Sequence, residues 1–83
     1  GGEEETVALR LPENMIGIIL DRFGKDIDIR MAGEGMVSVR IKAAVSRQFY
    51  GWLTGLGAEI TVTGPEHVRR GYIDYLENIM RNY

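Results

Sequence analysis

The residue types that usually carry out catalysis are sparse in this 83-residue chain. It has no cysteine and a single histidine, His67, so neither a thiol–imidazole pair nor a zinc site of cysteines and histidines can form. Asp26 and Asp28 point the same way if their segment is a strand, but alternation along any strand produces such a pair. We therefore predict a protein that is not an enzyme, with no catalytic residues, no metal and no cofactor.

Two binding chemistries are also disfavoured. Gly55-Leu56-Gly57 weakly resembles a phosphate-binding loop, but no helix follows it directly and no lysine accompanies it, so we interpret it as a helix stop. The segment 36–42 has none of the aromatic side chains that stack on RNA bases. The formal net charge of −2 excludes nucleic-acid binding by bulk positive charge.

Basic residues at alternating positions are the remaining candidates for binding. Arg10, Arg40 and Lys42 fall on the polar side of two predicted central strands, with Arg30 beside them at the edge. This surface is either a mixed, solvated face or a contact face for an acidic partner or an anionic ligand. Tyr50 is the aromatic residue of its helix that is left over for an interface, although its ring could simply lie on the surface.

Four segments in which apolar and polar residues alternate predict four strands, each with one covered face. We expect them over residues 6–11, 26–31, 36–45 and 59–63. The side chains expected to point inward are Val7, Leu9, Leu11, Ile27, Ile29, Met31, Val37, Val39, Ile41, Ile60 and Val62.

Helical spacing of apolar residues predicts three helices, over 14–23, 46–54 and 65–83. Ser46 suits the N-cap of the second, in which Phe49 and Leu53, and Trp52 with Leu56, should join the core. The third helix should present a continuous apolar stripe. Its members are Val68, Tyr72, Leu76, Ile79 and Tyr83.

The order of these elements predicts an α+β fold, the ferredoxin-like βαββαβ arrangement, in which the first and third strands are central. Helices would cover one face of the antiparallel sheet, and the additional C-terminal helix could cap the core or carry an interface. We expect one domain over residues 6–83, preceded at 1–5 by a linker or tag remnant. The longest apolar run, 15–20, is too short for a membrane span, so we expect no membrane partner.

A series of motifs covers almost the whole chain. They are Val7-Ala8-Leu9-Arg10, Asp21-Arg22-Phe23-Gly24, Val45-Ser46, Phe49-Tyr50-Gly51-Trp52-Leu53, Gly55-Leu56-Gly57 and Pro65-Glu66. Together they resemble the WCX domain, the C-terminal extension of WYL-domain transcriptional regulators. The structural motif positions of this resemblance are Phe49, Trp52, Leu53, Gly55, Gly57 and Pro65.

The resemblance implies a cytoplasmic bacterial regulator in which a helix-turn-helix domain binds DNA and a WYL domain senses an effector. Neither domain lies in this sequence, so DNA would be bound only through the absent helix-turn-helix. The extension itself would assist dimerisation and effector-dependent control, with a second copy and the upstream WYL domain as its partners. The alternative is an amino-acid- or nucleotide-sensing domain of ferredoxin-like type. Such domains have a glycine-bearing loop after the first strand, where this chain has Pro12-Glu13-Asn14.

Overall fold

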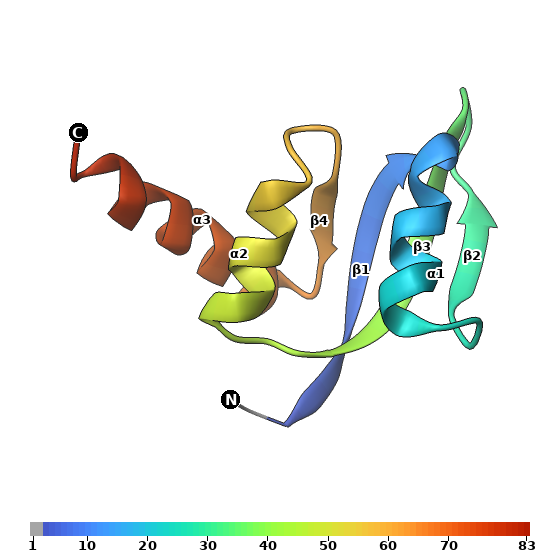
Figure 1. Ribbon diagram of the computed structural model, residues 1–83, viewed down its shortest axis with the longest axis horizontal. Helices are drawn as coiled ribbons and strands as arrows, with labels where there is room; N and C mark the ends of the chain where they lie inside the picture. The colour runs from blue at the N-terminus through green and yellow to red at the C-terminus, as the bar shows by residue number, and fades with distance from the viewer. Residues whose placement is uncertain (1–2) are drawn as a thin grey trace.

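The computed structural model describes residues 3–83. Of residues 1–5, where a linker or tag remnant was expected, the first two lie outside the described part, and Glu4 and Glu5 belong to the first strand. The strands are β1 (Glu4–Pro12), β2 (Asp28–Met31), β3 (Met36–Ala44) and β4 (Thr61–Gly64). The helices are the short 3-10 turn η1 (Glu13–Met15), α1 (Ile16–Phe23), α2 (Arg47–Gly55) and α3 (Glu66–Met80). Figure 1 shows their arrangement.

The four strands form one antiparallel sheet in the order β2-β3-β1-β4, which confirms the α+β class and the central position of the first and third strands. The longest pairing joins β1 to β3, from Glu4 opposite Ala44 to Pro12 opposite Met36. It therefore runs the full length of both strands. β4 pairs over a shorter stretch, with an irregularity between Ala8 and Leu9 of β1.

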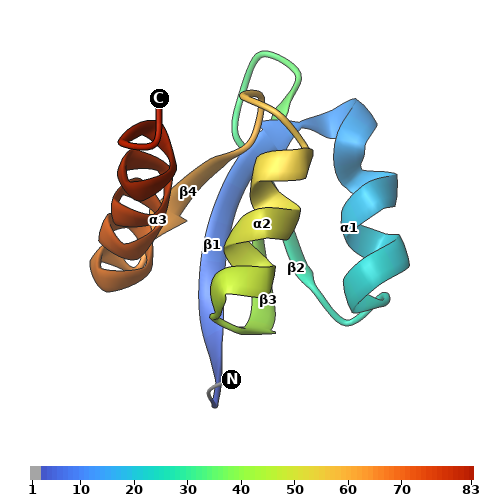
Figure 2. The same ribbon diagram turned by 60° about the vertical axis from the view of Figure 1, so that its left-hand side comes forward.

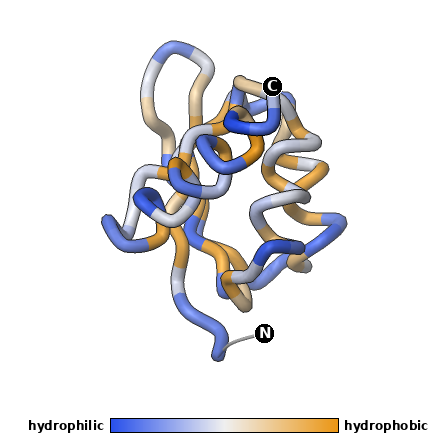
Figure 3. Tube along the Cα trace, turned by 90° about the vertical axis from the view of Figure 1, so that its left-hand side faces the viewer, coloured by the Kyte–Doolittle hydropathy of each residue, from blue (hydrophilic) through white to orange (hydrophobic). Residues whose placement is uncertain are grey.

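One face of the sheet is covered by α1 and α2, while α3 lies beside β4 (Figure 2). The alternation predicted for β1 and β3 is confirmed, because every odd-numbered apolar residue from 7 to 11 and from 37 to 43 is buried. The helices contribute Ile19, Phe49 and Leu53 to this core. Hydrophobic positions recur along the trace in Figure 3, whereas the described N-terminal end is hydrophilic.

Local capping explains where the helices begin and end. The Ser46 hydroxyl accepts a hydrogen bond from the Phe49 amide at 3.2 Å, as expected for an N-cap. Gly24 follows α1 with a φ of 79°, a conformation that glycine adopts without a Cβ penalty. The first predicted helix is divided in the structure, since Glu13–Met15 forms the 3-10 turn before α1.

The inward orientation predicted for Ile29 and Met31 of β2 is confirmed, but neither side chain is buried. Register places Ile29 opposite Val39 and Met31 opposite Val37, so both lie on the helix-covered side of the sheet. They are nevertheless 40% and 72% exposed. β2 is an edge strand, and the helices do not extend far enough to cover its side chains.

The apolar stripe predicted for α3 is buried only in the first half of the helix. Val68 is fully buried and Tyr72 is half-buried, but Leu76, Ile79 and Tyr83 are exposed. A 15-residue helix is about 22 Å long, whereas four residues of β4 span about 13 Å. The C-terminal half of α3 therefore extends past the sheet, as Figure 1 shows.

Of two oppositely charged pairs spaced four residues apart on α3, only one forms a contact. Glu66 contacts Arg70 at 4.0 Å, as the spacing of four residues predicts. Arg81 also lies four residues after an acidic side chain, Glu77, but its guanidinium donates to the Asn78 side-chain oxygen at 2.9 Å.

A close approach of α3 to α2 depends on Gly71. A Cβ at this position would lie 3.2 Å from Cζ of Tyr50 and closer still to the tyrosine oxygen. Gly17 on α1 has nothing within 4 Å of the corresponding position. Comparing alanine substitutions at Gly17 and Gly71 therefore distinguishes the effect of a steric clash from the general effect of replacing glycine in a helix.

We expect Gly71→Ala to lower the free energy of unfolding by about 1–3 kcal/mol relative to Gly17→Ala, because only the first inserts a methyl group into occupied space. Both variants gain helix propensity, so their difference isolates the clash with Tyr50. Urea denaturation followed by circular dichroism measures it. Equal stabilities of the two variants would show that α3 moves away from α2 at no cost.

Candidate anion-binding face of the sheet

The uncovered face of the sheet, hereafter the open face, brings together the four basic residues proposed as contacts. Ser38 on β3 lies opposite Arg10 of β1 on one side and opposite Arg30 of β2 on the other. Arg40 follows Ser38 by two residues and therefore shares its face, as does Lys42. Directly opposed residues have Cβ atoms about 5 Å apart, so Ser38 lies in the sheet between Arg10 and Arg30, with Arg40 two residues further along β3. We call Arg10, Arg30 and Arg40 the arginine triad.

Glu4 of β1 shares the alternation of Lys42, and the acidic side chain that contacts these basic residues is Asp28. It contacts Arg30 at 3.2 Å and Arg40 at 3.8 Å, and all three side chains are well exposed. Within residues 3–83, neither Arg10 nor Lys42 forms an ion pair. The open face therefore keeps an excess of positive charge although the chain as a whole is slightly acidic.

The middle of the open face is hollowed because its side chains are small. A shallow depression of about 380 Å³ adjoins the arginine triad at Arg40. It is lined by Thr6, Ala8, Ser38, Arg40, Thr63, Gly64 and Pro65. Guanidinium groups bind carboxylate or phosphate through paired hydrogen bonds, and a serine hydroxyl can add a further donor. This arrangement suits an anionic group on a ligand or partner.

Ser38 was not predicted as a site residue, although the sequence places it on the polar side of its strand. Its position between two arginines follows from the pairing of β3 with both neighbours, which no single strand reveals. Thr61 lies opposite Arg10 on β4, the other edge strand. Glu59 precedes β4 and is not part of the sheet.

Tyr50 lies away from the arginine triad, between α2 and α3. Its hydroxyl donates to the Val68 carbonyl at 3.1 Å, and its ring stacks on Tyr72 with centroids 5.5 Å apart. Thr54 and Tyr72 join their hydroxyl groups at 3.3 Å beside this stack. Tyr50 thus attaches α3 to the body of the domain, and its proposed role toward a partner stays a prediction.

Burial raises the pKa of Tyr50 above its ordinary value of 10, with smaller contributions from Glu5 and Asp74. A raised pKa means that the folded state favours the neutral phenol. The resulting stabilisation is present below the unfolded pKa and is lost as the pH rises through the folded pKa.

We expect Tyr50→Phe to lower the free energy of unfolding at neutral pH by about 1 kcal/mol, because the bond to the Val68 carbonyl is lost. It should also reduce the fall in stability above about pH 10, since the phenol responsible is removed. Denaturant midpoints measured against pH test both effects. Tyr83→Phe is the control, because that side chain is fully exposed. A Tyr50→Phe chain with the wild-type alkaline slope would contradict the assignment.

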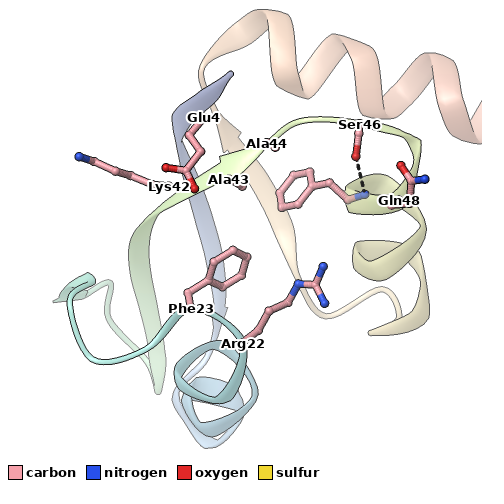
Figure 4. Close-up of a pocket in the computed structure, with 9 residues that line it drawn as sticks. Glu4, Arg22, Phe23, Lys42, Ala43, Ala44, Ser46 and Gln48 are labelled. Atoms are coloured by element: carbon pink, nitrogen blue, oxygen red, sulfur yellow. Dashed lines mark hydrogen bonds between the residues drawn. The ribbon is translucent and has the colours of Figure 1, made fainter. Parts of the chain in front are cut away.

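A second hollow, of about 460 Å³, opens between α1 and α2 (Figure 4). Phe23 and Phe49 lie on its apolar side, while Arg22 and Glu4 come from different elements at its rim. The Arg22 guanidinium lies 4.9 Å from the centroid of the Trp52 ring, an attractive cation–π geometry. Arg22 is thus already engaged by the fold.

The motif positions have structural roles around the same helix. Phe49 and Leu53 are buried, and Trp52 packs against Phe49 and edge-on against Phe23 at 5.4 Å. Gly57 has a φ of 87°, which permits the turn after α2. Gly55 ends α2, and Pro65 occupies the N-cap position of α3.

These positions agree with a comparison against protein families. Residues 3–80 match the profile described as the WCX domain. The chain belongs to the WCX domain family. This membership confirms the resemblance derived from the motifs, and WCX domains are associated with regulatory proteins rather than with known catalytic activities. A search of curated proteins found no match.

His67 is exposed, and its Nε2 lies 2.6 Å from a carboxylate oxygen of Glu5, an ordinary surface contact. The part of the chain that the structure describes contains no group of three acidic, histidine or cysteine side chains that could hold a metal ion. None of its helices combines the length and apolar character needed to cross a bilayer.

Proposed function

We propose that this WCX domain is a non-catalytic regulatory module of a cytoplasmic bacterial regulator that also carries helix-turn-helix and WYL domains. Its role would be to assist dimerisation and effector-dependent control of DNA binding, with the upstream WYL domain and a second copy as partners. Family membership over residues 3–80 supports the regulatory assignment. The order of elements, with β1 and β3 central, supports a ferredoxin-like topology.

The arginine triad around Ser38 is the observation that supports effector control. Three arginines on adjacent strands, of which Arg30 and Arg40 contact the carboxylate of Asp28, leave a positively charged patch on the sheet. An anionic group of the effector or of the WYL domain would bind there. A group that binds one docked arrangement of the domains more tightly than another shifts their populations, and this would transmit the signal to the DNA-binding domain.

The same patch also supports the alternative, a domain that senses a small anionic molecule such as an amino acid or a nucleotide. The two proposals differ in what meets the arginine triad. A sensing domain would bind the molecule as an isolated chain, whereas a docking module would need the rest of the regulator.

We expect Arg10→Glu and Arg40→Glu to weaken the effector response of the full-length regulator, because each reverses one charge of the triad. Arg10→Glu should have the larger effect, since Arg40 already contacts Asp28. A transcriptional reporter measures the response across effector concentrations. Lys25→Glu, an exposed reversal in the loop before β2, is the matched control.

An unchanged response in both variants would rule out the arginine triad as the point of control. Thermal unfolding of the isolated chain in a panel of amino acids and nucleotides separates the alternative, because a ligand that binds only the folded state raises its apparent stability.

A further inference from the structure

The outer half of α3 presents apolar side chains that no other part of the described chain covers. Leu76, Ile79 and Met80 are 37%, 41% and 72% exposed, and Tyr83 is fully exposed. α3 ends at Met80, and the Tyr83 amide donates to the Met80 carbonyl at 3.0 Å, so a tight turn places Tyr83 directly after the helix. Burial of a side chain of this size stabilises by about 1.5–3 kcal/mol, which makes this surface a strong candidate for an interface.

The spacing of these residues is that of a helix that pairs with another helix. Ile73, Leu76, Met80 and Tyr83 follow one another at intervals of three, four and three residues. Such a heptad pattern places them along one side of the helix, where two helices can pack side by side. We call these four residues the α3 seam.

The inner end of the α3 seam opens onto a groove along β4. This groove has a volume of about 230 Å³. It is lined by Ile60, Thr61, Val62, Arg69, Tyr72 and Ile73. One end of α3 therefore has an apolar groove beside it, and the other end has an uncovered apolar tip. Two copies related by a two-fold axis would place each tip in the groove of the other.

Charge along the seam selects the antiparallel arrangement. Arg70 and Glu77 flank the seam on the same side, seven residues and about 10 Å apart along the axis, too far to pair within one helix. In an antiparallel pair, equivalent flanking positions of the two helices face each other, so Arg70 of each copy meets Glu77 of the other. A parallel pair would not bring these two residues together.

We propose that α3 is a self-association helix: two copies of this chain pair antiparallel through the α3 seam, with Arg70 of each copy contacting Glu77 of the other. The inference rests on the dimerisation role in the proposed function and gives that role a surface. The residues of the arginine triad do not line the groove, although Thr61 of the groove lies opposite Arg10 of β1.

Sedimentation velocity of the chain across a concentration series tests the pairing. We expect a concentration-dependent dimer, and we expect Leu76→Glu to weaken it by about tenfold or more, because a charge would be buried in the seam. Ile18→Glu is the control, since Ile18 is 39% exposed on α1 and lies outside the seam. Circular dichroism of both variants checks the fold. A monomer at every concentration, or a dimer that Leu76→Glu leaves intact, would overturn the inference.

Reversing the charge of Arg70 or of Glu77 tests whether the two helices pair antiparallel. The decisive result is a gain of pairing in a mixture and not a loss. Arg70→Glu and Glu77→Arg should each weaken self-association, because each homodimer would bring like charges together. An equimolar mixture of the two variants should form heterodimers, since every flanking pair is then of opposite charge. A variant that merely fails to fold cannot produce this recovery.

A mixture that stays monomeric would overturn the antiparallel pairing. It would leave the proposed function standing, because the reporter response of the Arg10 and Arg40 variants tests the open face independently.

Discussion

The antiparallel pairing of β1 with β3 is the constraint on which the rest of the structure depends. Its nine-residue register fixes which side chains enter the core, since Val7, Leu9 and Leu11 oppose Ile41, Val39 and Val37. The same register fixes the opposite face, where it sets Arg10 beside Ser38. A shift of one residue would exchange the two faces, burying arginines and exposing leucine and valine. The hydrophobic core and the charged patch are thus two outcomes of one alignment.

The sequence was informative wherever a local pattern has a single physical meaning. Alternation predicted the covered side of β1 and β3, and the Ser46 hydroxyl predicted the start of α2. The sequence was misleading where the burial of a side chain depends on whether a neighbouring helix or strand covers it. Met31 is on the expected side of its strand but at the sheet edge, and Leu76 is on the expected stripe but beyond the end of β4. Local periodicity says which way a residue points, but not whether anything is there to cover it.

The candidate site was predictable to the same extent. Alternation alone assigned the basic residues to one face. The position of Ser38 between Arg10 and Arg30 could not be predicted, because it follows from the register of three strands. Tyr50 was expected at an interface or at the surface, because its helix has more aromatic residues than the core can take. In the structure its hydroxyl donates a hydrogen bond to the Val68 carbonyl of α3. That contact joins residues 18 positions apart, a relationship that no short window of sequence contains.

The outer edge of β2 has a consequence for solubility. An unpaired strand edge with uncovered Ile29 and Met31 could recruit another extended chain and seed aggregation. Asp28 and Arg30 alternate with these residues, and β2 is only four residues long, both of which discourage such pairing. Two charged side chains of the open face thus also occupy the positions where charge opposes growth of the sheet.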